Sequence, residues 1–206
     1  DAFNDIAARV DQLVDKERVI VLTDIATAPA APLSMVRFLV YANEFDVEGL
    51  VAGTSTWMRN KVRPDVIQHV IDAYDAVQPT LATHAAGYPT AAALRAVVTT
   101  GQPGYGMAAV ATDKMSPGAD RIIQSVDRSD PRPVWVLAWG GSNTLAQALL
   151  RVRETRPPDQ LQVFVSKCRV YAISDQDDAG RLIRREFPAL AYIAIPSRRD
   201  GDQYYQ

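Results

Sequence analysis

The sequence predicts an α/β fold with a doubly wound, mostly parallel sheet and helices on both faces. Short runs of continuous apolar residues, typical of strands buried on both sides, alternate with segments whose apolar residues recur at helical spacing. At 206 residues the chain is long enough to bury a sizeable core. It has no internal repeat and no low-complexity linker, so we expect a single domain over residues 1–206.

The first half of the chain alternates strands with helices. The run VIVLT is rich in β-branched residues and opens into a polar loop, as a buried strand would. Pro64 suits the first turn of a helix, and the apolar residues that follow it have helical spacing. The elements predicted here are strands at Val19–Thr23 and Val47–Ala52, and helices at Leu33–Asn43, Pro64–Val77 and Thr90–Thr99.

The second half repeats this alternation. One short apolar strand runs directly into the pair Gly140 and Gly141. The loop GQPGYG is neither a Walker loop nor a dinucleotide fingerprint, so we expect a flexible loop there. The predicted elements are helices at Ala119–Val126, Asn143–Arg153 and Asp178–Phe187, and strands at Val134–Ala138, Arg169–Ile173 and Tyr192–Ile195.

Charge and composition exclude several classes of partner. The 22 basic and 24 acidic residues provide no positive field for a phosphate backbone, so we expect no nucleic-acid partner. No apolar run approaches the roughly 20 residues that cross a bilayer, and the start, DAFNDIAARVDQLVDK, is charged and amphipathic rather than signal-like. We therefore expect no membrane partner. The single cysteine, Cys168, begins an apolar run and is predicted to be a core residue.

Polar and aromatic residues gather where the predicted strands end. Ligands of open parallel sheets bind beyond the carboxyl ends of the strands, where the loops converge. Several carboxylates at one edge repel each other unless protons or a cation intervene, and calcium prefers oxygen ligands of this kind. The candidate site residues are Asp24, Thr54, Trp57, Trp139, Asn143, Asp175 and Asp177.

Each candidate also has a simpler structural explanation. Asp24 could cap the following helix or close a turn, and Asn143 could cap its own helix. Asp177 or Asp178 could cap the helix that ends at Phe187. The tryptophans could be core residues. No Ser, Cys or His arrangement specifies nucleophilic catalysis. The convergence of four strand ends is what favours a site.

Long stretches of the chain resemble a known family. They are SMVRFLVYANEFDVEGLVAGTSTW, KVRPDVIQHVIDAY, HAAGYPT, GQPGYGMAAV, DPRPVWVLAWGGSNTLAQAL, VYAISDQDDAG and IRREFP. In these the chain resembles the nucleoside-hydrolase-like domains at the front of cellulose-binding proteins. The resemblance covers nearly the whole chain and implies the doubly wound fold of nucleoside hydrolases.

The resemblance also implies a chemistry. Nucleoside hydrolases cleave N-ribosidic bonds with water activated by calcium, which a cluster of aspartates holds. By resemblance, Asp24 is the base and a calcium ligand, and Asn143 and Asp177 are further ligands. Thr54, Trp57, Trp139, Asn143 and Asp175 would contact a nucleoside or carbohydrate. A homo-oligomer, a further module after Gln206 and a secreted or periplasmic location are also compatible with this resemblance.

The loop after the first strand departs from the family pattern. Relatives carry two adjacent acids where this chain has Ala30 and Ala31, and typically Asn and Glu where it has Thr27 and Ala28. Alanine offers no side-chain oxygen, so calcium binding should be weakened or absent. Two hypotheses follow. The domain hydrolyses N-glycosyl bonds, with its activity put in question by this loop, or it is a non-catalytic carbohydrate-binding or interaction domain that uses the same cleft.

Overall fold

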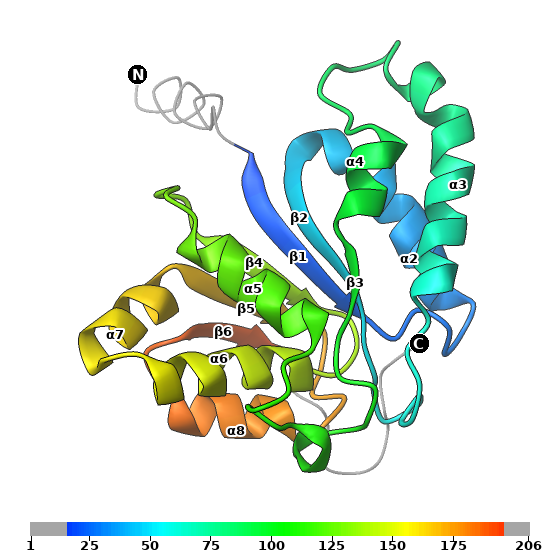
Figure 1. The fold of residues 1–206 in the computed structure, drawn as a ribbon. Helices are drawn as coiled ribbons and strands as arrows, with labels where there is room; N and C mark the ends of the chain where they lie inside the picture. The colour runs from blue at the N-terminus through cyan, green and yellow to red at the C-terminus, as the bar shows by residue number, and fades with distance from the viewer. Residues whose placement is uncertain (1–15, 196–206) are drawn as a thin grey trace, which may run out of the picture.

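The computed structural model describes residues 16–195 and shows a six-stranded sheet whose paired strands are all parallel (Figure 1). The strand order is β3-β2-β1-β4-β5-β6, in which the chain reverses direction across the sheet between β1 and β4. This confirms the predicted doubly wound class. The strands are β1 (Glu17–Thr23), β2 (Phe45–Ala52), β3 (Val98–Thr100), β4 (Val134–Ala138), β5 (Cys168–Ala172) and β6 (Ala191–Ala194).

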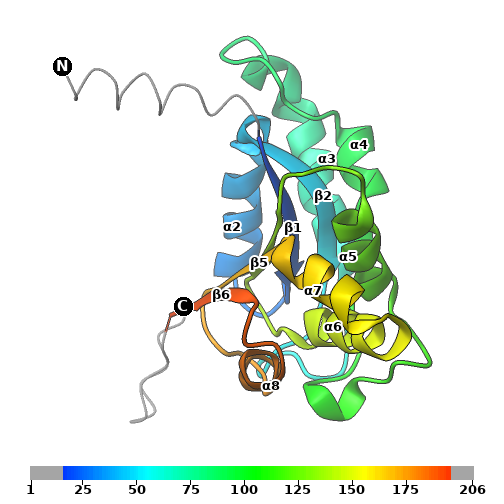
Figure 2. The ribbon, with the colours of Figure 1, turned by 90° about the vertical axis from the view of Figure 1, so that its left-hand side faces the viewer.

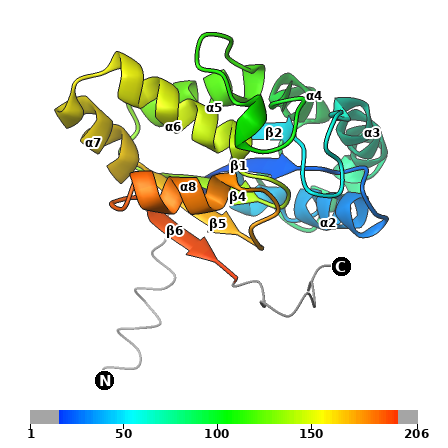
Figure 3. The ribbon, with the colours of Figure 1, turned by 90° about the horizontal axis from the view of Figure 1, so that it is seen from below.

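Helices lie on both sides of the sheet (Figures 2 and 3). One side carries α2 (Ala30–Leu39), α3 (Pro64–Leu81) and α4 (Ala91–Ala96), which pack over the β1–β3 half. The other side carries α5 (Pro117–Asp127), α6 (Asn143–Thr155), α7 (Pro158–Ser166) and α8 (Ala179–Glu186). Single 3-10 turns occur at Ala42–Glu44 and Met107–Ala109. No helix within residues 16–195 is long and apolar enough to cross a membrane.

The structure corrects two predicted helix boundaries and adds one helix. The helix predicted over Thr90–Thr99 ends at Ala96, because Val98–Thr100 is an edge strand that pairs with β2. Its β-branched residues favour a strand once a neighbouring strand is present to pair with. Helix α7 was not predicted, and α2 begins at Ala30 rather than Leu33. Ala30 and Ala31 thus lie in the first turn of α2.

The core has two halves, one on each face of the sheet. Val19 and Val21 of β1 face the α2–α3 side, whereas Ile20 and Leu22 face the α5–α6 side. This alternation explains why the strand sequences are continuously apolar. Cys168 is buried in the second half, as predicted, and burial raises the pKa of its thiol to about 12.

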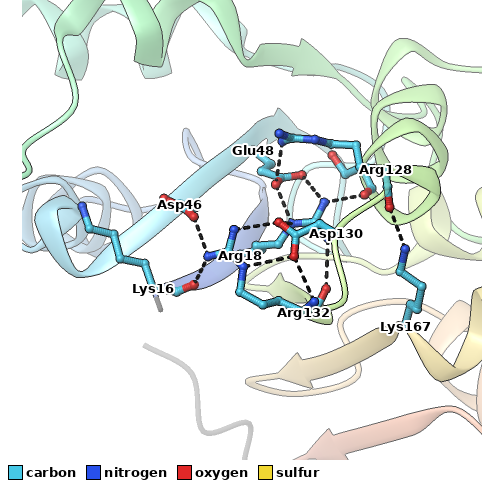
Figure 4. Close-up of polar contacts among 9 residues, drawn as sticks. Lys16, Arg18, Asp46, Glu48, Arg128, Asp130, Arg132 and Lys167 are labelled. Carbon is cyan, nitrogen blue, oxygen red and sulfur yellow. Dashed lines mark hydrogen bonds and ion pairs between the residues drawn. The ribbon is translucent and has the colours of Figure 1, made fainter. Parts of the chain in front are cut away.

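A network of ion pairs lies near the start of β1 and β2 (Figure 4). The Arg18 guanidinium is fully buried and donates to both carboxylate oxygens of Glu48, at 2.7 and 3.0 Å. It also donates to the carbonyl oxygens of Ser125 and Arg132, so its charge and donors are well satisfied. Arg132 pairs with Asp130, which holds the pKa of that carboxyl well below its usual range.

A β-bulge directs Glu48 into this network. The register of β1 against β2 pairs Val19 with Val47 and then Ile20 with Gly49, so Glu48 is the extra residue of β2. A bulge of this kind turns a side chain away from the regular alternation. A Cβ on Gly49 would lie 3.0 Å from the Ile20 side chain, so glycine suits this close approach.

Candidate functional site

A cleft of about 1600 Å³ opens beside the carboxyl ends of β1 and β4. The loop after β1 and the side of α2 form one wall, and residues that follow β4 and β5 form the other. The cleft lies where the strand order reverses, and open α/β sheets bind their ligands at this point. The lining residues are Thr23, Asp24, Thr27, Ala28, Pro29, Ala30, Ala31, Ser34, Arg37, Phe38, Tyr41, Phe45, Trp57, Trp139, Ile173, Gln176 and Ile195.

Asp24 provides the buried carboxylate of the cleft. It follows β1 directly and is only 4% exposed. Its Oδ2 accepts a hydrogen bond from the Ser55 hydroxyl at 2.5 Å, and the Ser55 oxygen in turn accepts from the Trp57 amide at 3.0 Å. Burial raises the pKa of Asp24, and the Ser55 bond opposes this rise. A carboxylate of raised pKa is a stronger base than an exposed one.

The turn of Gly140 and Gly141 brings Asp24 and Asp177 to neighbouring positions. A Cβ on Gly140 would lie 3.2 Å from the Asp24 carboxyl carbon. A Cβ on Gly141 would collide with the Asp177 carboxylate and would lie 2.7 Å from the Thr54 carbonyl oxygen. Glycine is therefore required for close packing at Gly141, and the two carboxylates flank the same short turn.

Asp177 lies behind this turn and is held by backbone amides. Its oxygens accept from the amides of Asn143 (2.9 Å) and Ala179 (3.0 Å). Burial raises its pKa to about 6, and these two amides oppose the rise. Asn143 donates from Nδ2 to the Gly104 carbonyl at 2.8 Å, whereas its buried Oδ1 has no partner among the described residues. Asp177 and Asn143 are thus in contact, but neither lines the open cleft.

Aromatic side chains line the cleft. Trp57 lines the cleft and is 56% exposed. Trp139 also lines the cleft and packs edge-on against Phe38 of α2, with 5.7 Å between the ring centroids. Gln176 links the loops that follow β2 and β4. Its side-chain amide donates to the Trp139 carbonyl, and its backbone carbonyl accepts from the Thr56 amide, both at 2.8 Å. These tryptophans are therefore pocket residues.

Two further predicted site residues, Thr54 and Asp175, also lie outside the cleft lining. The Thr54 hydroxyl is buried and donates to the Gly104 carbonyl at 3.0 Å. Asp175 forms a two-pronged ion pair with Arg184 of α8, at 2.9 and 2.6 Å. Neither side chain lines the cleft. Both are placed to support the loops around it.

Sequence reasoning missed the contribution of α2. Ser34, Arg37 and Phe38 line the cleft from this helix, and Tyr41 lines it from just beyond the helix end. Their spacing of three, four and seven residues places them on one face, which is a signal that the sequence contains. The sequence pattern did not separate cleft residues from core residues on this face, because Phe38 both lines the cleft and packs among buried residues.

The side chains of this region are a poor match for calcium. Calcium takes six to eight oxygen ligands, several of them carboxylates. Within residues 16–195, no three His, Cys, Asp or Glu side chains lie close enough to hold a metal ion. Asp24 and Asp177 already accept hydrogen bonds, and Ala30 and Ala31 contribute no oxygen. The Thr23 hydroxyl and Asn143 Oδ1 are buried without a partner among the described residues and add two oxygens, which still leaves fewer side-chain ligands than calcium takes.

A family comparison identifies the fold and its relatives. The family described as "Cellulose-binding Sde182, nucleoside hydrolase-like domain" matches residues 18–206. The chain belongs to this family. Its membership confirms the resemblance that the sequence motifs indicated. None of the curated proteins matches this chain.

A solved structure agrees with the family assignment. It is a nucleoside hydrolase-related hypothetical protein from Saccharophagus degradans, described as associated with carbohydrate metabolism. The two chains are 44% identical and superpose with a TM-score of 0.85 over 87% of this nucleoside hydrolase-like domain. The match covers 44% of that protein, so this chain spans less than half of its length.

Proposed function

We propose that this nucleoside hydrolase-like domain binds a carbohydrate or nucleoside ligand in the cleft without calcium-dependent hydrolysis. The observation that carries the proposal is the wall beside Asp24, where Ala28, Pro29, Ala30 and Ala31 line the cleft without a side-chain oxygen. Such a wall can pack against a ring, but its side chains provide no ligand for calcium.

The aromatic lining supports ring binding. Trp57 and Tyr41 are each 56% exposed and both line the cleft, so their ring faces are available to a ligand. Aromatic rings stack on the apolar faces of flat ligands, and the polar groups of Arg37 and Gln176 provide donors for ligand oxygens. The family description and the carbohydrate association of the solved relative are consistent with a sugar ligand.

N-glycosyl hydrolysis is the second candidate, and one observation favours it. Asp24 is a buried carboxylate of raised pKa within the cleft, which suits a general base. In this candidate Asp24 takes a proton from water, the Ser55 hydroxyl positions it, and Trp57 and Trp139 enclose the sugar or base. Asn143 and Asp177 support the Gly140 turn from behind.

Binding is tested by calorimetric titration of oligosaccharides and nucleosides against the intact chain. Trp57→Ala should weaken the affinity about 10-fold, since one aromatic contact contributes about 1–1.5 kcal/mol. Val163→Ala, at an exposed position on α7 outside the cleft, should leave the affinity unchanged. Equal affinities for wild type and Trp57→Ala would contradict the proposed site.

Hydrolysis is tested by reducing-sugar release from nucleosides, with and without calcium. We expect no calcium-dependent turnover in the wild type. Ala30→Asp/Ala31→Asp restores two carboxylates to the wall and should produce a heat of calcium binding that the wild type lacks. If the wild type turned over with calcium, and Asp24→Asn abolished that turnover while remaining folded, the second candidate would replace the first.

A further inference from the structure

Arg37 is a cation in the cleft without an acidic partner among the described residues. It lies in the last turn of α2, is exposed, and lines the cleft. Most arginines within residues 16–195 pair with a carboxylate, but Arg37 is in none of these ion pairs. The only other charged side chain in the described lining is Asp24, which is buried and already bonded to Ser55. Arg37 is therefore available to a negatively charged group on a ligand.

Ser34 adds a second donor beside Arg37. The two residues lie three positions apart on α2, which places their Cβ atoms about 5–6 Å apart on one side of the helix. Both are exposed and both line the cleft. Long side chains on a helix lean toward its N-terminus, so the Arg37 side chain extends toward the turn that holds Ser34. A guanidinium and a hydroxyl in this arrangement can bind the two oxygens of one carboxylate.

The start of α2 favours a carboxylate over a phosphate as the bound group. One guanidinium balances the single charge of a carboxylate, whereas a phosphate monoester carries about −1.5 to −2 at pH 7 and is often held by free amides at a helix start. The Ala31 amide already donates to the Ala28 carbonyl, at 3.1 Å. The Leu33 amide donates to the Pro29 carbonyl at 3.4 Å, and Pro32 has no N–H. Most amides of this turn are therefore unavailable to a phosphate.

The cleft has room for several linked sugar rings. Its volume of about 1600 Å³ exceeds the range of about 300–1,000 Å³ that is typical of small-molecule sites. Arg37 lies about 10 Å along the axis of α2 from Ala30, which lines the wall beside Asp24. Tyr41 lines the cleft beyond Arg37 and is 56% exposed, so its ring is available to a sugar. A chain of linked rings can thus extend from the Asp24 end of the cleft to Arg37.

We propose that Arg37 and Ser34 bind the carboxylate of an acidic sugar, so that the ligand of the cleft is an oligosaccharide that contains uronic acid. This inference rests on the proposed binding function and names the class of carbohydrate. Cellulose, which the family description mentions, has no charged group and leaves Arg37 without a role. Trp57 and Tyr41 contact the rings of the ligand, and Arg37 selects the charged one.

The test compares acidic oligosaccharides with their uncharged methyl esters by calorimetric titration of the intact chain. The probes are oligosaccharides of galacturonate, glucuronate and mannuronate. Each ester keeps the rings and removes the charge, so the comparison isolates the contribution of the carboxylate. At low salt one of the acids should bind about 5-fold more tightly than its ester, which corresponds to about 1 kcal/mol for one exposed ion pair. The preference should shrink at high salt, because ions screen an exposed pair.

Two arginine variants assign the preference to its residue. Arg37→Gln keeps a polar amide but removes the charge, so the acid and its ester should then bind equally. Arg181→Gln removes an exposed arginine of α8 outside the cleft and should leave the preference for the acid at its wild-type value. Circular dichroism establishes that each variant is folded.

The contrary results separate this inference from the proposed function. Equal affinities of acid and ester in the wild type, both weakened by Trp57→Ala, would overturn the acidic-sugar inference and leave carbohydrate binding in the cleft intact. A preference for the acid that survives Arg37→Gln would assign recognition to another group and overturn the inference as well. If a nucleoside monophosphate bound more tightly than every acid and lost this advantage in Arg37→Gln, phosphate would be the bound anion instead. If only neutral oligosaccharides or nucleosides bound, this inference alone would fail, and if no probe bound, the proposed function would fail with it.

Discussion

Ionisation of Asp177 should destabilise this protein as the pH rises. Burial raises the pKa of its carboxyl from 3.8 to about 6, so the folded chain holds this proton more tightly than the unfolded chain. Stability from this group is therefore fully present below about pH 4 and is lost as the pH rises through about 6. A shift of about two pKa units corresponds to a contribution of about 3 kcal/mol to the free energy of unfolding. About 2 kcal/mol of this contribution is lost between about pH 4 and about pH 8.

Asp177→Asn removes the titration. The neutral amide can accept only one of the two backbone N–H bonds, from Asn143 or Ala179, which costs about 1 kcal/mol at every pH. The variant should therefore be less stable than the wild type in acid and more stable above neutral pH. The assay is urea unfolding of both proteins across this pH range in the presence of a chelator.

The comparison between variants isolates this one group. Other carboxyl groups titrate in both proteins and cancel in the difference of unfolding free energies. As a control, Asp113→Asn at an exposed position should change the unfolding free energy by less than about 0.5 kcal/mol. A difference between wild type and Asp177→Asn that stays constant from acid to alkaline pH would refute the reasoning.

Three further predictions follow from buried groups. Arg18→Met should lower the unfolding free energy by about 3–5 kcal/mol, measured by urea unfolding, because Glu48 then remains as a buried, partly uncompensated charge. Gly141→Ala should lower it by about 1–3 kcal/mol and abolish ligand binding in calorimetry, since its methyl group displaces the Asp177 carboxylate. Cys168 should resist thiol reagents near pH 8 until the chain unfolds, because burial raises its pKa to about 12.

Control variants test the first two of these predictions, and a labelling result tests the third. Arg128→Met removes the exposed partner of Glu48 and should change the unfolding free energy by less than about 1 kcal/mol. Gly53→Ala should be well tolerated, because the nearest atom to its Cβ is 4.0 Å away. Equal effects for Arg18→Met and Arg128→Met, or for the two glycine variants, would contradict the packing described. Rapid labelling of Cys168 in the native chain would contradict its burial.

Sequence patterns predicted most of the fold because the signals are local. Continuous apolar runs such as Val19–Thr23 and Val134–Ala138 lie within strands that the structure confirms. The edge strand Val98–Thr100 was missed because three residues carry no periodicity, and its pairing with Leu50 of β2 is a long-range event. Helix α7 was also missed, although its start at Pro158 is a recognisable signal.

The candidate site was only partly predictable. That Asp24, Trp57 and Trp139 follow strand ends is a property of the sequence, and the parallel sheet brings these three into one cleft. The direction in which each side chain points cannot be predicted from the local sequence. Asp175 turns toward Arg184 and Thr54 toward Gly104, because partners distant in sequence provide the hydrogen bonds that their burial or position requires.

The sequence by itself determined the fold class, the family and the absence of side-chain oxygens at Ala30 and Ala31, since each depends on residue type and local order alone. Only the tertiary structure decided which polar groups are buried, and therefore that burial raises the pKa of Asp24 and Asp177. It also decided that β5 and β6 present Tyr171 and Ile193 without a described helix above them. Burial is a property of neighbours, and the chain acquires those neighbours only by folding.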